Sequence, residues 1–262
     1  MLTRRTFAAL AAGFVGTMGI SGTANANTLD GIMKSGTIRI AVPQDFPPFG
    51  SVGLSLQPEG YDIDTARLIA HALGVKLVLV PVTSDNRIPY LQTNKVDLVI
   101  SSLGKTPDRA KVIDFSEDYA PFFSGVFGPP GLDVSKPADL AGKTIGVTRG
   151  AIEDLVLTQI APPGAVIHRY GDNASTIAAF LSGQSQLIAT ANSTAAVIIA
   201  RHPPRLPELK FVLKNSPCYI GVAKGNPALL AKVNAIIAQA KQDGALNKIS
   251  VKWLDMPLPA GF

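Results

Sequence analysis

Arg109 is the residue whose type and position most clearly indicate chemistry in this sequence. It follows a short apolar run at 96–100 that is typical of a buried strand, and Pro107 favours the start of a short helix. The loop between them is polar and contains Ser101, Ser102, Gly104 and Thr106. A guanidinium near the carboxyl end of a strand suits a carboxylate, because it can donate two parallel hydrogen bonds. The residues alone leave a second interpretation equally open, in which Arg109 is a solvated helix residue.

Composition favours a folded binding or catalytic protein over a nucleic-acid-binding one. The chain has 262 residues, of which 47% are hydrophobic and 16% charged, so it can bury a sizeable core. The formal net charge of +5 is too mild and too scattered to indicate nucleic acid as a partner. Cys218 is the single cysteine, which excludes an intrachain disulfide and a cysteine-based metal site.

The first residues are typical of an export signal. Arg4 and Arg5 precede an apolar run at 7–20, and small residues lead to Ala26, after which we predict cleavage. No later apolar stretch approaches the roughly 18–20 residues of a spanning helix, so we expect an exported, soluble protein in the periplasm. The TRRTF segment also resembles a twin-arginine export motif, which would mean export after folding. An alternative to cleavage is that the segment stays attached and anchors the protein to the membrane.

Strand and helix patterns then alternate, which predicts α/β structure with parallel sheets. In the first half we expect strands at 37–42, 75–82 and 96–100, with helices at 62–73 and 86–94. In the second half we expect strands at 143–147, 165–169 and 186–190, helices near 152–160, 173–182 and 193–201, then a strand at 218–226 and helices at 228–242 and 244–253. The similar spacing suggests two related lobes.

Several segments, in order, resemble the periplasmic solute-binding proteins of polar amino acid ABC importers, that is, bacterial extracellular solute-binding protein family 3. They are TIRIAVPQDFPPFG, EGYDIDTARLIAHALG, NRIPYLQTNKVDLVI, SSLGKTPDRAKVIDF, FSEDY, DLAGKTIGVTRG and NKISVKWL. The resemblance implies a type II periplasmic-binding-protein-like fold, with two α/β lobes joined by two crossing strands and a ligand cleft between them. After the signal at 1–26, it places the first lobe at 27–124 and 221–262 and the second lobe at 125–220.

The same resemblance implies a small carboxylate ligand, foremost an amino acid, that is delivered to an ABC permease in the inner membrane. We expect a monomer with no cofactor. The resemblance assigns Arg109 and the 101–106 loop to the ligand's α-carboxylate, and Ser101 and Ser102 to its ammonium. It further assigns ligand contacts to Phe46 and Tyr61 as aromatic walls, and to Gly150, Ala151 and Asn192 in the second lobe.

Three sites of the family pattern differ in this sequence. Gly104 and Ala151 lack hydroxyl groups that relatives offer, and Ala191 and Asn192 stand where relatives place an acid for the ligand's ammonium. An unpaired ammonium in a closed cleft is costly. Either another acid replaces the missing one, with Asp62, Glu153 and Asp154 as candidates, or the ligand lacks that ammonium.

No catalytic motif is present, and the three histidines have no metal-ligand spacing. We therefore expect a binding protein, not an enzyme, with no catalytic residue and no metal. Two alternatives stay open: a cyclohexadienyl (prephenate or arogenate) dehydratase on the same fold, with Glu153 or Asp154 as a buried general acid, and a sensory ligand-binding protein.

Overall fold

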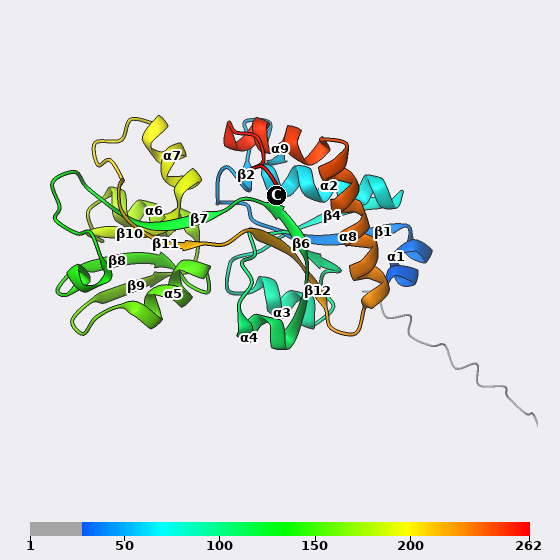
Figure 1. Cartoon of the computed structure of the whole chain (residues 1–262), viewed down its shortest axis with the longest axis horizontal. Helices are drawn as coiled ribbons and strands as arrows, with labels where there is room; N and C mark the ends of the chain where they lie inside the picture. The colour runs from blue at the N-terminus through cyan, green and yellow to red at the C-terminus, as the bar shows by residue number, and fades with distance from the viewer. Residues whose placement is uncertain (1–27) are drawn as a thin grey trace, which may run out of the picture.

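The computed structural model describes residues 28–262, whose strands form two five-stranded sheets and a two-stranded hairpin. Figure 1 shows the two large sheets at opposite ends of the molecule, each covered by its own helices. We call these two units the first and the second lobe. The predicted export signal lies outside the described residues.

The first lobe is built on the sheet β4-β1-β5-β12-β6. Its strands are β1 (Thr37–Val42), β4 (Lys76–Pro81), β5 (Leu98–Val99), β6 (Ile113–Ala120) and β12 (Cys218–Ala223). β1 runs parallel to β4 and β5, whereas β12 is antiparallel to β5 and β6. The carboxyl ends of β1, β4 and β5 therefore share one edge, where ligands bind in open parallel sheets.

Helices and a small hairpin complete the first lobe. The hairpin pairs β2 (Ser51–Val52) with β3 (Pro58–Glu59). The helices are α1 (Leu29–Ser35), α2 (Tyr61–Leu73), α3 (Arg87–Gln92), α4 (Pro107–Val112), α8 (Pro227–Gln242) and α9 (Ala245–Leu254). α2 packs against β1 and β4 and buries the apolar stripe that the sequence predicts, including Ile63, Ala66 and Ile69.

The second lobe is built on the sheet β11-β7-β10-β8-β9. Its strands are β7 (Phe123–Gly128), β8 (Thr144–Thr148), β9 (Val166–Tyr170), β10 (Leu187–Ala191) and β11 (Glu208–Asn215). The helical segments are η1 (Pro137–Leu140), α5 (Ile152–Ile160), α6 (Asn173–Leu181) and α7 (Asn192–Ala200). β8, β9 and β10 are parallel, and β7 is antiparallel to β10 and β11.

Two connections join the lobes, and Figure 1 shows them side by side in the middle of the molecule. One leads from β6 through residues 121–122 into β7, and the other leads from β11 through residues 216–217 into β12. The predicted domain boundaries, after residues 124 and 220, fall inside β7 and β12 and stay a prediction. The predicted fold class, two α/β lobes with crossing strands, is confirmed.

Candidate functional site

The loop after β5 brings the first group of predicted residues to the sheet edge. Thr106 caps α4, because its Oγ1 accepts a hydrogen bond of 3.2 Å from the Arg109 amide. Arg109, in the first turn of this helix, is buried, with 7% exposure. The Arg109 Nη1 donates to the Gly104 carbonyl at 2.7 Å. Ser101 and Ser102 lie buried in the same loop.

Asp62, at the start of α2, fixes the conformation of that loop. Its Oδ2 accepts hydrogen bonds from the amide and the hydroxyl of Ser102, at 2.8 and 3.0 Å, and its Oδ1 accepts one of 2.6 Å from the Tyr119 hydroxyl. Ser102 has a φ of 45°, an uncommon region that these bonds hold in place. Burial raises the pKa of Asp62 to about 7, against the lowering effect of its hydrogen bonds.

The second lobe contributes the turn at Gly150 and Ala151 and the first residues of α5. Asp154 stabilises this turn, since it accepts 3.0 Å and 2.7 Å hydrogen bonds from the Gly150 amide and from Arg169 Nε. Glu153, one residue earlier, is 3% exposed, and its Oε1 has no hydrogen-bond partner in the described part of the chain. Burial raises the pKa of Glu153 to about 7, although Arg87 and Arg109 lower it.

Contacts between the lobes hold this arrangement closed. Arg109 Nη2 donates to the Gly150 carbonyl at 2.8 Å, and Thr194 Oγ1 donates to the Pro47 carbonyl at 2.8 Å. Asp45 accepts hydrogen bonds from the amides of Asn173 and Ala174, at the start of α6. Ile152 and Ala191 of the second lobe are part of the main apolar cluster of the first lobe.

A cavity lies between the lobes at this closed interface. Its volume of 20 Å³ is close to what a single water molecule needs, so an amino acid requires the lobes to open. The residues that line it come from both lobes: Pro43, Phe46, Val82, Ser84, Arg87, Ser101, Ser102, Phe122, Ala151, Ile152, Glu153 and Asn173.

The sequence-predicted ligand contacts do not all lie at the cavity. Phe46, Ser101, Ser102 and Ala151 line it. Beside it, Arg109 donates to Gly104 in its own lobe and to Gly150 in the second lobe, and Thr106 acts as the cap of α4. Tyr61 is fully buried in the first lobe, where its hydroxyl donates to the Tyr119 carbonyl. Asn192 lines a separate apolar pocket of 180 Å³ near the crossing residues Pro121 and Phe122.

Arg87 is a cavity residue that the sequence reasoning missed. It begins α3, is 3% exposed, and donates to the Ser101 carbonyl. The signal was available, because Arg87 follows the strand predicted at 75–82 much as Arg109 follows the strand at 96–100. Both strands are parallel to β1, so their following loops reach the same edge of the sheet.

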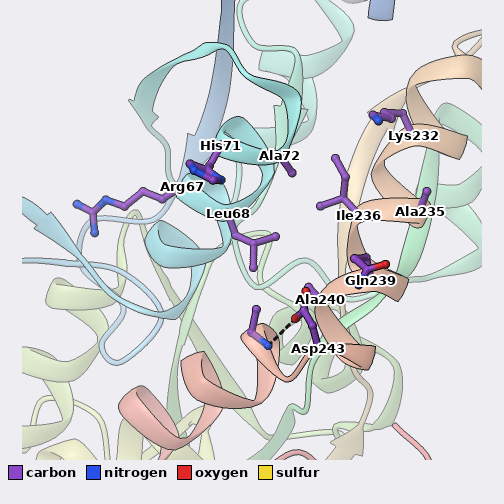
Figure 2. A pocket seen from close by; sticks show the side chains of 11 residues that line it. Arg67, Leu68, His71, Ala72, Lys232, Ala235, Ile236, Gln239, Ala240 and Asp243 are labelled. Atoms are coloured by element: carbon purple, nitrogen blue, oxygen red, sulfur yellow. Dashed lines mark hydrogen bonds between the residues drawn. The ribbon is translucent and has the colours of Figure 1, made fainter.

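A larger groove of 630 Å³ lies within the first lobe, between α2 and α8. Figure 2 shows Leu68 and Ile236 pointing into it from these two helices. Its charged lining residues, among them Arg67, Lys232 and Asp243, are exposed. Exposed charges of this kind stay solvated, whereas the cleft between the lobes holds buried charges that need partners.

Residues 28–262 offer neither a metal-binding cluster nor a membrane-spanning helix. No group of three or more potential metal-binding side chains is present in this range. No helix in this range is long and apolar enough to cross a membrane.

Comparisons with known proteins agree with this architecture. The L-cystine-binding protein TcyJ of Escherichia coli is 26% identical over 249 residues, covering 93% of this chain and 92% of the relative. The glutamine-binding protein GlnH of the Bacillus subtilis ABC transporter is 29% identical, covering 87% of this chain and 85% of the relative. An ancestral arginine-binding protein, solved with bound glutamine, superposes with a TM-score of 0.79 at 31% identity, covering 84% of this chain and 99% of that structure.

These relatives are named as binding proteins and not as enzymes, which supports solute binding over the dehydratase alternative. The family model for bacterial extracellular solute-binding proteins, family 3, matches residues 38–256. The chain therefore belongs to the family 3 extracellular solute-binding proteins.

Proposed function

We propose that this protein binds an amino acid as a zwitterion in the cleft between its lobes and delivers it to an ABC permease. One observation carries the proposal. Arg109 from the first lobe and Glu153 from the second lobe are both buried at this cleft. Neither takes part in an ion pair among residues 28–262. A ligand with one carboxylate and one ammonium group supplies the missing partner of each.

Glu153 is the acid that we assign to the ammonium. The Asp62 carboxylate already accepts hydrogen bonds from Ser102 and Tyr119. The Asp154 carboxylate already accepts hydrogen bonds from Gly150 and Arg169. Glu153 alone among the three candidates keeps a buried oxygen without a partner in the described part of the chain. Its place in the first turn of α5 also favours the ionised form, since the helix dipole is positive there.

The α-carboxylate goes to Arg109. In the closed arrangement Arg109 donates to the backbone carbonyls of Gly104 and Gly150. When the lobes open, the bond to Gly150 is lost and this donor becomes available. A carboxylate is a stronger acceptor than a carbonyl, so the ligand replaces Gly150 and draws the lobes together around itself.

The setting of the protein is part of the proposal. We propose a periplasmic monomer, released after signal cleavage near Ala26, with lobe boundaries near residues 124 and 220. The partner is an inner-membrane ABC permease that recognises the closed form.

A thermal-shift screen of the protein purified from the periplasm tests the proposal. The panel contains the standard amino acids and their deaminated carboxylate analogues. A ligand at a hundred times its Kd adds about 2.7 kcal/mol of stability. We expect at least one amino acid to raise the Tm, and Arg109→Met to remove the response. If no amino acid raises the Tm, the proposal is wrong. If analogues without the ammonium raise the Tm as much as the amino acids do, Glu153 does not bind the ammonium.

A further inference from the structure

Arg87 is a buried cation of the cleft that the proposed function leaves unused. Its Nη1 donates to the Ser101 carbonyl, and its Nη2 lies 3.5 Å from the Gly150 carbonyl. Its Nε is buried and has no hydrogen-bond partner in the described part of the chain. Buried donors in proteins nearly always find an acceptor, so this Nε requires one from outside the protein.

The nearby acids do not supply that acceptor. Asp62 and Glu153 both act electrostatically on Arg87, but neither lies within ion-pair distance of it. Both oxygens of Asp62 already accept hydrogen bonds from Ser102 and Tyr119. Glu153 reaches the cavity from the opposite lobe and keeps its own unpartnered oxygen. Within residues 28–262, the cavity therefore has an unpartnered donor on one wall and an unpartnered acceptor on the other.

On the basis of the proposed amino acid binding, we infer that the ligand's side chain ends in an oxygen acceptor, a carboxylate or a primary amide, which Arg87 binds. Arg109 then holds the α-carboxylate and Glu153 the ammonium. A cationic side chain would be repelled by the buried positive charge of Arg87, and an aliphatic side chain would leave its Nε without an acceptor. Phe46, Phe122 and Ile152 form the apolar wall around the rest of the ligand.

Isothermal titration calorimetry with individual amino acids tests this inference. The panel is glutamate, aspartate, glutamine, asparagine, leucine, lysine and arginine, titrated into wild-type protein and into Arg87→Met. We expect wild type to bind an acidic or amide amino acid at least tenfold more tightly than leucine, lysine or arginine. Arg87→Met is expected to remove that preference by weakening the acidic or amide ligand at least tenfold. Comparing glutamate with glutamine, and aspartate with asparagine, identifies the carboxylate or the amide as the preferred acceptor.

Arg67→Met serves as the matched control, because Arg67 is an exposed arginine of the same lobe. Circular dichroism and the Tm show whether each variant folds, and Arg87→Gln replaces Arg87→Met if the latter does not. If leucine, lysine or arginine binds wild type most tightly, or if the folded Arg87 variant keeps wild-type preference, the inference is overturned while amino acid binding stands. If none of the seven binds wild type while another standard amino acid raises its Tm, the inference is overturned and amino acid binding stands. If no standard amino acid raises the Tm, the proposed function itself is overturned, and the inference with it.

Discussion

Arg109 Nη2 lies 2.8 Å from the carbonyl oxygen of Gly150, so one guanidinium of the first lobe bonds directly to the backbone of the second. Its other terminal nitrogen, Nη1, donates to Gly104 in its own lobe. The residue that we propose as the carboxylate anchor is thus also a contact that exists only when the lobes are closed. Ligand binding and lobe closure therefore depend on the same side chain.

Replacing Arg109 by lysine should weaken amino acid binding strongly. Lysine keeps the charge but loses the planar pair of donors that a carboxylate matches. Charge-assisted hydrogen bonds contribute about 1.5–3 kcal/mol each, so losing one raises the Kd roughly 10- to 150-fold. Calorimetry with the best ligand measures this change. The exposed Arg67→Lys is the control, and equal affinities of Arg109→Lys and wild type would contradict the anchoring role.

Asp45→Ala should favour the open form without touching the ligand. Asp45 accepts hydrogen bonds from the amides of Asn173 and Ala174 at the start of α6, in the opposite lobe. Neutral hydrogen bonds contribute about 0.5–1.5 kcal/mol each, and those to a charged group about 1.5–3 kcal/mol. We expect a larger radius of gyration by small-angle X-ray scattering of the ligand-free protein, because the closed form loses these two bonds between the lobes.

Asp172→Ala is the matched control for that experiment. Asp172 caps the same helix from within its own lobe, through a 2.7 Å hydrogen bond from the Ser175 amide. Its loss should cost about 1 kcal/mol of unfolding free energy and leave the radius of gyration unchanged. If both variants changed the radius of gyration alike, the effect would belong to the helix and not to lobe closure.

Local sequence patterns predicted most elements of the fold. The strand at 37–42 and the helix at 152–160 have the predicted bounds, and most other predicted elements differ by one or two residues. β11 was not predicted. It pairs only with β7 at the edge of its sheet and is partly exposed on both faces, so it lacks the apolar alternation of a half-buried strand.

The binding residues were less predictable, because their partners are distant in sequence. Arg109 could be singled out from its loop, but its bond to Gly150 spans 41 residues. Asp62 and Asp154 could not be separated from Glu153 as candidate acids. The structure separates them through the contacts of Asp62 with Ser102 and Tyr119 and of Asp154 with Gly150 and Arg169. The contacts with Ser102, Tyr119 and Arg169 are distant in sequence, so no local pattern indicates them.

Gly104→Ser should weaken ligand binding, although it would add a hydroxyl group to the loop that holds Arg109. A Cβ atom at Gly104 would lie 3.3 Å from Cγ1 of Ile152, which belongs to the opposite lobe. Packing of this kind resists added volume, so the lobes would close less completely. We expect a several-fold rise in Kd by calorimetry. Adding Ile152→Ala should recover part of the affinity; if Gly104→Ser alone bound more tightly, the steric interpretation would be wrong.

The pH dependence of binding should report on Glu153. Burial raises its pKa from 4.5 to about 7, so the native state holds more protons than the unfolded chain between these values. Stability from this residue therefore falls as pH rises through that window. The affinity for the amino acid changes with pH in the opposite direction and rises with pH, because only the ionised carboxylate of Glu153 accepts a hydrogen bond from an ammonium. Affinity should rise by up to about thirtyfold from pH 5.5 to 8, since each pH unit below the pKa costs tenfold.

Glu153→Gln separates this effect from the other buried acid. Asp62 also has a pKa raised to about 7 by burial, so the variant should keep part of the fall in stability with rising pH. The rise in affinity should nevertheless disappear, because the amide that replaces the carboxyl group does not titrate, and the Kd at pH 8 should be at least tenfold weaker than that of wild type. Titration calorimetry from pH 5.5 to 8 measures how affinity depends on pH in the variant and in wild type. An unchanged affinity slope in the variant would assign the titration to Asp62, and the ammonium would then have another acceptor.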